Sequence, residues 1–309
     1  MTALRDSFGQ ALLALGAEHP DVVVLNADLA SATKTSLFAK QFPERHFNCG
    51  IAEENMASIA AGLAAGGLSP FISGFAMFTA GRSFEQIRNN IGYPHLNVKI
   101  CATHGGLSVG EDGASHQCCE DFALMRTIPG MTVVCPCDDA EARAAVRAAY
   151  ELNGPVYLRF SRSSAPDMHS NPDFPFAIGK AEMLRNGYDV ALIANGLMVS
   201  RAMEAAGMLA KQGISAAVWN FATIKPLDED ALKEISTTVR CIVTCEEHSI
   251  IGGLGEAVAA WIGENHPMPL SRIGVADVFG SSGKAEEVLS AYGLTSDHIS
   301  EATAKLLHK

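Results

Sequence analysis

Short apolar runs alternate with longer segments of helical pattern along most of the chain. In the first half, runs rich in β-branched residues predict buried strands at Val22–Leu25, Phe71–Ile72, Val98–Ala102, Thr132–Cys135 and Val156–Phe160. The segments between them predict helices at Leu4–Leu15, Glu53–Ala65, Ser83–Ile91 and Asp138–Tyr150. Apolar strands that alternate with helices are typical of a parallel sheet covered by helices. Residues 1–165 are therefore predicted to form an α/β domain.

The pattern lapses at residues 166–180 and then resumes. Pro166, Pro172 and Pro175 lie among polar residues there, which indicates a linker between two domains. Beyond it, strands are predicted at Asp189–Ala194, Ala216–Asn220, Cys241–Thr244 and Ser271–Val275, and helices at Ser200–Lys211, Asp230–Ile235, Leu254–Ile262, Ala285–Ala291 and Ser296–Leu306. Residues 181–309 are predicted to form a second, smaller α/β domain.

Composition and charge argue against several classes of protein. The chain has 309 residues, of which 48% are hydrophobic, and this is ample for two buried cores. The net charge is −11 and basic residues do not cluster, so nucleic acid is not an expected partner. The N-terminus lacks the pattern of a secretion signal, and no apolar run has the length of a membrane span, so we expect a cytoplasmic protein without a membrane partner. The glycine motifs of dinucleotide-binding and P-loop proteins are absent from the sequence.

The eight cysteines could suggest a metal site, particularly in Cys135-Pro136-Cys137. None of them has the two-residue spacing that is typical of zinc ligand pairs, and several fall in apolar strand-like runs. Buried, reduced thiols are the better interpretation, and we expect no metal bound by this chain.

The segment from Thr103 to Gln117 concentrates groups that can carry out chemistry. It places two histidines, two carboxylates and four glycines directly after a predicted strand. Imidazoles exchange protons near neutral pH, carboxylates accept hydrogen bonds from hydroxyl groups, and glycines let the backbone approach a ligand closely. The segment therefore suits a polar substrate that needs proton transfer, although a solvated, turn-rich loop explains the same composition.

A second candidate lies at the start of a predicted helix, in Gly50-Ile51-Ala52-Glu53-Glu54. Acidic residues in a first helical turn commonly just complement the helix dipole, and that is the simpler interpretation of Glu53 and Glu54.

A specific resemblance changes this interpretation. Thr103-His104 followed by Ser108-Val109-Gly110-Glu111-Asp112-Gly113-Ala114-Ser115-His116-Gln117 resembles the segment of transketolases that reads Thr-His and then Gly-x-Gly-Glu-Asp-Gly-x-(Ser/Thr)-His-Gln. Transketolases and their relatives have a domain in which one glutamate meets the aminopyrimidine ring of thiamin diphosphate. The resemblance matches Glu53, and not Glu54, to that catalytic glutamate. A carboxyl group that shares a proton with the ring favours the imino tautomer, which can then deprotonate the thiazolium C2.

The resemblance also implies how the rest of the cofactor is held. Ser73-Gly74-Phe75-Ala76-Met77-Phe78 matches the aromatic segment that stacks on the aminopyrimidine, so Phe75 and Phe78 are expected cofactor contacts, although plain core packing also explains such a pair. Gly81 replaces a further aromatic residue of many transketolases. Asp28 is expected to bind the cofactor, while the family's serine downstream of Asp28-Leu29-Ala30 is shifted or replaced near Ala32.

Further family positions imply the contacts of a sugar phosphate. They are His104, Arg162 and Arg5 for the phosphate, Asp112 for a substrate hydroxyl, and His116 as the catalytic residue that handles a proton at the reacting carbonyl. Arginine suits phosphate because its guanidinium is planar and always charged. The second half resembles the transketolase C-terminal domain through Glu246–Gly255 and Val278–Gly283, which are expected to be structural or interface elements.

In the family, a Gly-Asp-Gly segment and a downstream Asn supply protein oxygens that bind the divalent cation of the diphosphate. This sequence contains no Gly-Asp-Gly. The resemblance therefore implies the C-terminal subunit of a split transketolase. Its partner would be an N-terminal subunit that carries the diphosphate and the Mg²⁺ or Ca²⁺ site, most simply in an α2β2 assembly with thiamin diphosphate shared between subunits. The enzyme would transfer a two-carbon ketol unit from a ketose phosphate to an aldose.

Three alternatives stay open at this point. The chain could be a 1-deoxyxylulose-5-phosphate synthase-like subunit, a 2-oxoacid dehydrogenase β-like subunit, or a non-catalytic regulatory paralogue. The spacing from His104 to Asp112 and the pair Glu111-Asp112 favour transketolase. The sugars are not identified, and both the pentose phosphate pathway and a branched-sugar route, such as one through apulose phosphate, remain possible.

Overall fold

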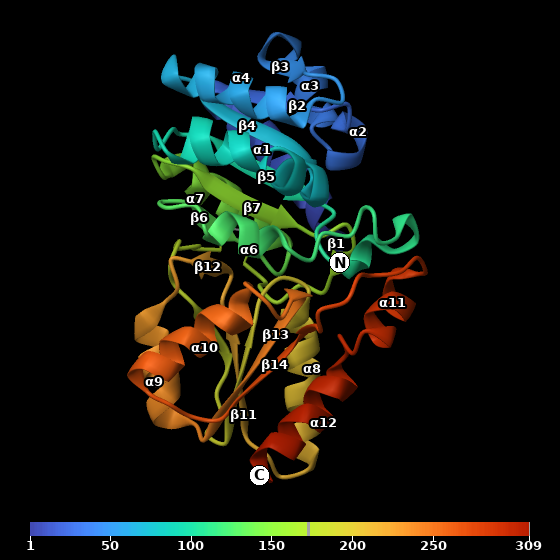
Figure 1. The fold of residues 1–309 in the computed structure, drawn as a ribbon, viewed down its shortest axis with the longest axis vertical. Coiled ribbons are helices and arrows are strands. Elements are labelled where there is room, and N and C mark those ends of the chain that lie inside the picture. The colour runs from blue at the N-terminus through green and yellow to red at the C-terminus, as the bar shows by residue number, and fades with distance from the viewer. Residues whose placement is uncertain (172–173, 309) are drawn as a thin grey trace.

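A seven-stranded sheet forms the centre of the first half of the molecule (Figure 1). The computed structural model describes residues 1–171 and 174–308. Across the sheet the strands are β12 (Thr223–Lys225), β6 (Thr132–Val134), β7 (Val156–Phe160), β5 (Lys99–Thr103), β4 (Ser69–Phe75), β2 (Val22–Asn26) and β3 (His46–Asn48). All neighbouring pairs from β6 to β3 are parallel. The predicted parallel-sheet α/β domain is confirmed.

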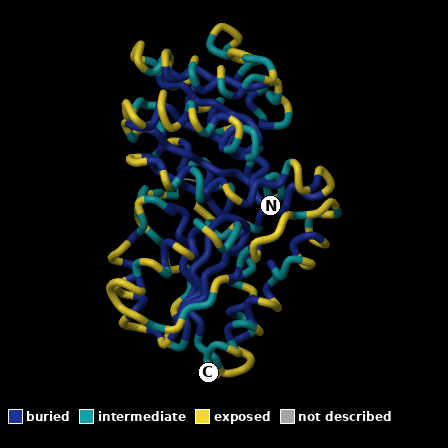
Figure 2. Tube along the Cα trace, viewed as in Figure 1, coloured by how far each residue is buried: buried dark blue, intermediate teal, exposed yellow. Residues whose placement is uncertain are grey.

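Helices cover both faces of this sheet because its central strands are apolar on both sides. In β2, Val22 and Val24 face α1 (Leu4–Glu18), α3 (Ser36–Gln41) and α7 (Asp139–Glu151), and Val23 and Leu25 face α4 (Glu53–Ala65) on the other side. This alternation follows from the two-residue period of a strand. Burial of each large apolar side chain contributes roughly 1.5–3 kcal/mol to the free energy of unfolding. Figure 2 shows the resulting buried strands through the middle of each half.

A five-stranded sheet forms the centre of the second half. Its order is β14 (Leu270–Val275), β13 (Cys241–Ser249), β10 (Val190–Ala194), β11 (Ala216–Asn220) and β9 (Glu182–Arg185), and only β9 runs antiparallel to its neighbour. The helices of this half are α8 (Met198–Lys211), α9 (Glu229–Thr238), α10 (Leu254–Asn265), α11 (Ala285–Ala291) and α12 (Ser296–Leu307). The predicted smaller α/β architecture is confirmed.

The sequence pattern missed short and irregular elements. The edge strands β3, β9 and β12 were not predicted, nor was helix α6 (Asp121–Arg126). The predicted helix Ser83–Ile91 is a single turn, α5 (Phe84–Gln86), between two π-helical segments, Met77–Arg82 and Ile87–Gly92. Strand β12 belongs to the second half of the chain but pairs antiparallel with β6, so it extends the sheet of the first half.

Among the described residues, no helix or strand lies between β8 (Ser164–Ala165), which pairs with β1 (Thr2–Ala3), and β9. Pro172 and residue 173, within the predicted linker, and residue 309 lie outside the described residues. Asp138 holds this segment: its Oδ2 accepts the backbone N–H groups of Met168 and His169 at 2.8 and 2.7 Å. The two ring nitrogens of His169 lie 2.9 Å from Asp138 Oδ2 and 2.7 Å from Glu182 Oε2.

All eight cysteines are free thiols, and all but Cys49 are buried, as the apolar pattern around most of them predicted. No helix in the described part of the chain is both long and apolar enough to cross a membrane.

The pair of carboxylates around His169 predicts a pH-dependent stability. Burial alone would lower the pKa of His169, but hydrogen bonds to Asp138 and Glu182 outweigh it and raise the pKa to about 9. Because the pKa is higher in the folded chain, protonated His169 stabilises the fold fully below the pKa of the unfolded chain, near 6.5. This stabilisation is lost as the pH rises through about 9. We expect the free energy of unfolding to fall by about 3 kcal/mol across this window and His169→Gln to remove that fall. Urea denaturation at a series of pH values measures it, with the exposed His298→Gln as the control. An unchanged slope in His169→Gln would contradict the prediction.

Candidate functional site

Most of the predicted site residues lie at one edge of the seven-stranded sheet. Phe75 ends β4, His104 follows β5, and Arg162 follows β7 by two residues. Asp28 stands two residues beyond the end of β2. Because neighbouring parallel strands have their carboxyl ends at the same edge, the fold brings these residues together from distant parts of the chain.

Four aromatic rings form the centre of this edge. Phe75 stacks on His104 with ring centroids 3.8 Å apart, and it stacks on Phe78 at 5.9 Å. His116 meets Phe78 edge-on at 5.4 Å. The two histidines of the Thr103–Gln117 segment, which we call the substrate loop, therefore lie directly against the two phenylalanines that the sequence assigned to the cofactor.

Glu53 begins α4, and its side chain is only 2% exposed. Its Oε2 forms an ion pair with Arg82 Nη1 at 2.9 Å, and the Arg82 guanidinium carbon lies 5.4 Å from the centroid of the Phe78 ring. Glu54, the neighbouring carboxylate, is only partly buried. Glu53 is thus the carboxylate that connects to the aromatic cluster, and it does so through Arg82.

Sequence reasoning missed Arg82. A usable signal was present: Arg82 stands four residues after Phe78, a spacing that places two side chains on one face of a helix. The segment Met77–Arg82 is π-helical, and such segments occur frequently at functional sites.

The other end of the cluster is cationic. Arg5 Nη1 lies 3.5 Å from His104 Nε2, and Arg5 Nε is buried without a hydrogen-bond partner in the described structure. Burial, together with the positive charges of Arg5 and Arg162, lowers the pKa of His104 to about 3. His104 is therefore neutral, with Nδ1 2.8 Å from Thr103 Oγ1. Two guanidinium groups around a neutral imidazole favour an anionic ligand.

The remaining predicted residues lie at the periphery. Arg162 donates to Val109 O and lies 3.3 Å from Glu111 Oε2. Asp112 ends the 3-10 segment Leu107–Asp112 and is exposed. Asp28 is also exposed, and its Oδ1 accepts a hydrogen bond of 3.2 Å from Asn48 Nδ2. The structure does not bring Asp28 into contact with the aromatic cluster.

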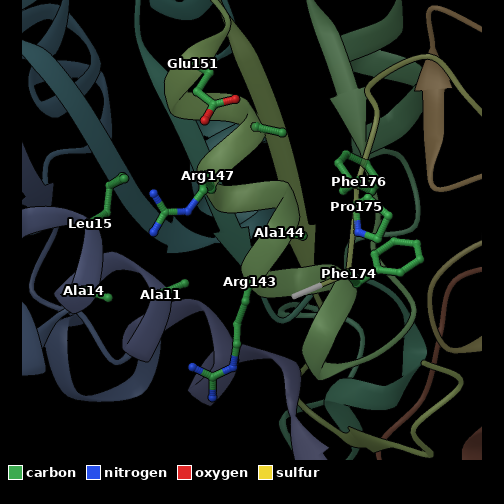
Figure 3. Close-up of a pocket in the computed structure, with 11 residues that line it drawn as sticks. Ala11, Ala14, Leu15, Arg143, Ala144, Arg147, Glu151, Phe174, Pro175 and Phe176 are labelled. Carbon is green, nitrogen blue, oxygen red and sulfur yellow. The ribbon is translucent and has the colours of Figure 1, made fainter. Parts of the chain in front are cut away.

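A groove of about 430 Å³ lies elsewhere, between α1, α7 and the segment Phe174–Phe176 (Figure 3). Both of its arginines are in ion pairs: Arg143 with Asp139 at 3.0 Å and Arg147 with Glu18 at 2.9 Å. None of the predicted site residues lines this groove.

Comparison with known proteins identifies the arrangement. The family model of the transketolase pyrimidine-binding domain matches residues 1–168, and that of the transketolase C-terminal domain matches residues 179–299. The chain belongs to the transketolase family.

Its relatives include single subunits of about the same length. The chain is 48% identical to a transketolase C-terminal section of Methanocaldococcus jannaschii, over 99% of this chain and 96% of that protein. It is 41% identical to the 6-deoxy-6-sulfo-D-fructose transketolase subunit SqwH of Clostridium sp., with 99% and 95% covered, and 38% identical to an apulose-4-phosphate transketolase subunit of Phocaeicola vulgatus, with 100% and 99% covered. A split-gene transketolase solved as an inactive β4 tetramer is 50% identical, with a TM-score of 0.91 and 99% and 98% covered.

Transketolases depend on thiamin diphosphate. The buried Glu53 carboxylate and the Phe75–Phe78 rings fit the flat, polar-edged aminopyrimidine. For the cation of the diphosphate, the described residues offer a single group of three possible ligands, Cys137, Asp138 and His169. Both ring nitrogens of His169 already contact carboxylates, those of Asp138 and Glu182. None of the three possible ligands is among the site residues that the sequence predicted. Glu53, Phe75 and Phe78 are thus the described residues whose chemistry fits the aminopyrimidine.

Two glycines at the start of the substrate loop allow it to lie against Arg159 of the first half and Glu247 of the second half. A Cβ on Gly106, which has φ +79°, would lie 2.5 Å from the Glu247 carboxyl carbon, and a Cβ on Gly105 would overlap Arg159. The loop backbone can approach Arg159 and Glu247 this closely only because positions 105 and 106 are glycines, which have no Cβ.

We expect Gly106→Ala to lower the free energy of unfolding by about 2–4 kcal/mol, since it combines an unfavourable φ with overlap. Gly62→Ala in the exposed part of α4 meets no atom within 4 Å and is the matched control, expected to be neutral or to stabilise by about 0.5–1 kcal/mol. Chemical denaturation of both variants measures the difference. Equal effects of the two substitutions would contradict the packing argument.

Proposed function

We propose that this chain is the C-terminal subunit of a split transketolase that transfers a two-carbon ketol unit from a ketose phosphate to an aldose. The observation that carries the proposal is the contact of Phe75 and Phe78 with His104 and His116, beside the buried carboxylate of Glu53. The phenylalanine rings would contact the cofactor ring, and the adjacent histidines would contact the sugar. A regulatory paralogue without catalysis would have no use for this convergence.

When bound, thiamin diphosphate would supply a thiazolium ring whose C2 carbon serves as the nucleophile and which itself serves as the electron sink. Glu53 would hold a proton at the aminopyrimidine nitrogen, with Phe75 and Phe78 orienting the ring. Arg82 Nη1 contacts Glu53 through Oε2, so the ring would bind through the other carboxylate oxygen, Oε1, while this ion pair stays in place. Glu53 would then keep a partner throughout, which a buried carboxylate requires.

At the substrate end, His116 would donate or accept a proton at the oxygen of the reacting carbonyl. Arg5 and Arg162 would bind the terminal phosphate, with His104 as a neutral hydrogen-bonding group between them. Asp112, which is exposed at the tip of the substrate loop, would accept a hydrogen bond from a sugar hydroxyl. Asp28, which accepts a hydrogen bond from Asn48, would bind the cofactor at its outer edge.

A partner subunit completes this proposal. It would supply the diphosphate contacts and the Mg²⁺ or Ca²⁺ ligands, and the simplest assembly is α2β2. The inactive β4 tetramer of the 50%-identical split-gene transketolase supports the need for a second kind of subunit. Relatives named for 6-deoxy-6-sulfo-D-fructose and for apulose 4-phosphate support a ketose with a terminal anion as the donor class.

The chain alone is expected to bind thiamin diphosphate weakly and to show no ketol transfer. Addition of a diphosphate-binding transketolase subunit and Mg²⁺ should restore both, measured by calorimetry and by consumption of a ketose phosphate. Turnover of pyruvate in place of the ketose phosphate would favour the synthase-like or 2-oxoacid dehydrogenase-like alternative. Robust turnover by the isolated chain would refute the split arrangement.

Glu53→Gln should slow hydrogen–deuterium exchange at C2 of the bound cofactor by about a hundredfold or more, because an amide cannot share a proton with the aminopyrimidine. Nuclear magnetic resonance of quenched samples of the reconstituted complex measures this exchange. Glu54→Gln, one residue away and partly exposed, is the matched control and should exchange at the normal rate. The reverse result would show that Glu54 is the functional carboxylate.

A further inference from the structure

The second half of the molecule packs directly on the substrate loop. Helix α11 lies against the 3-10 segment Leu107–Asp112, on the side of the molecule where the two halves meet (Figure 1). Gln117 Nε2 donates to Ser281 O at 2.9 Å and to Leu107 O at 3.3 Å, so one side chain joins both ends of the loop to the second half. The loop that carries Asp112 and His116 is therefore supported from outside its own sheet.

A second buried support of the loop is Glu247 on β13. Its side chain is 5% exposed, and Oε1 accepts the backbone N–H of Ser108 at 2.5 Å. Its backbone carbonyl accepts a hydrogen bond of 2.8 Å from Arg159 Nη2 on β7. Ser108 is 139 residues away in sequence, so this contact exists only because the two halves dock.

A carboxylate in this place is costly to bury. Burial raises the pKa of Glu247, although the charge of Arg159 and the hydrogen bond from Ser108 act in the opposite direction. An apolar residue would fill the same volume without that cost. The carboxylate provides two things here that an apolar residue would not: a negative charge near Arg159, and an acceptor that fixes the position of the Ser108 N–H next to Gly106.

We propose that Glu247 is a positioning residue, through which the second half holds the substrate loop in the geometry that presents Asp112 and His116 to the sugar. The catalytic part of this inference rests on the function proposed above. The structural part, the restraint of the loop by Glu247, does not.

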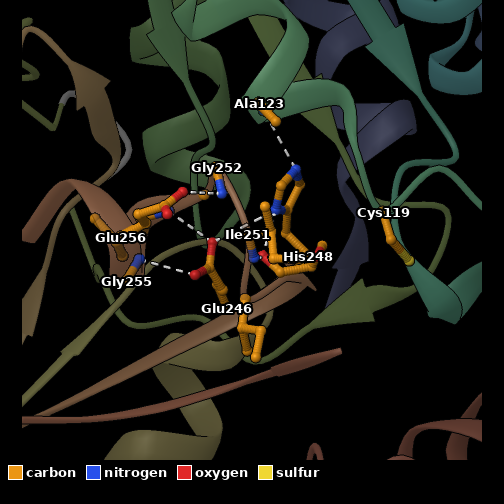
Figure 4. Close-up of polar contacts among 12 residues, drawn as sticks. Cys119, Ala123, Glu246, His248, Ile251, Gly252, Gly255 and Glu256 are labelled. Carbon is orange, nitrogen blue, oxygen red and sulfur yellow. Dashed lines mark hydrogen bonds and ion pairs between the residues drawn. The ribbon is translucent and has the colours of Figure 1, made fainter. Parts of the chain in front are cut away.

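Glu246 provides a matched control. It is the preceding residue on β13 and is fully buried as well, but its two carboxylate oxygens accept the N–H groups of Leu254 and Gly255 at 2.7 and 2.8 Å, at the start of α10 (Figure 4). Its hydrogen bonds stay within the second half. Substitution of Glu246 should therefore loosen α10 and leave the substrate loop unchanged.

The first measurement is amide hydrogen exchange of the isolated chain, followed by mass spectrometry. Glu247→Leu removes the acceptor, and peptides that cover residues 105–112 should exchange roughly tenfold faster, since a buried N–H loses its partner. Glu247→Gln keeps an acceptor oxygen and should stay close to wild type. Glu246→Gln should speed exchange only near residues 252–258. Glu247→Asp, which withdraws the carboxylate by one methylene, is the second variant if Glu247→Leu does not fold, and it should release the loop in the same way.

The second measurement uses the complex with the partner subunit. Glu247→Leu or Glu247→Asp should lower kcat/KM for a ketose phosphate by about tenfold or more, while C2 exchange of the cofactor, which depends on Glu53, keeps its rate. Unchanged loop exchange in folded variants overturns the proposal, and so does a released loop with unchanged sugar turnover. If the wild-type complex shows no ketol transfer, the proposed function fails, and the exchange measurement on the isolated chain still decides whether Glu247 restrains the loop.

Discussion

The buried guanidinium of Arg159 is the interaction on which the arrangement of the two halves depends. It is 3% exposed and lies 3.5 Å from Asp121 Oδ2, which also accepts a hydrogen bond of 2.7 Å from Tyr157. It donates to the Glu247 carbonyl and lies 4.5 Å from the Phe122 ring. Removal of one partner from a buried ion pair commonly costs about 3–5 kcal/mol, because the other charge stays buried. The Arg159 guanidinium on β7 thus contacts both α6 of its own half and β13 of the other sheet.

That charge also limits what can stand next to it. Gly105 has no room for a Cβ because the Arg159 side chain fills the space, and His104 immediately before it has φ +58°. The turn out of β5 is therefore sharp, and it directs the His104 ring onto Phe75 instead of away from the sheet. The position of the His104 imidazole thus follows from the packing of a structural arginine.

The sequence predicted those parts of the molecule that depend on local pattern. Val156–Phe160 was predicted and observed as the same strand, because its apolar side chains fill both faces of a parallel sheet. Strand β12 was missed because Thr223–Lys225 is a three-residue edge strand that pairs with a distant part of the chain. The same distinction holds for the site. The substrate loop was recognisable by its motif, whereas the contacts of Arg82 with Glu53 and of Glu247 with Ser108 connect residues 29 and 139 positions apart. A single sequence carries little information about such pairs.

The pair of Glu53 and Arg82 connects the fold with the need for a second subunit. A buried carboxylate is stable only with a partner, and in this chain the partner is Arg82, which also lies over Phe78. Arg82 contacts Oε2 of Glu53, so a cofactor ring that binds through Oε1 would leave the ion pair in place and the buried charge partnered. Under the proposed function, Glu53 would thus serve Arg82 and the aminopyrimidine at the same time, and the contacts of the diphosphate and its cation would lie on the partner subunit.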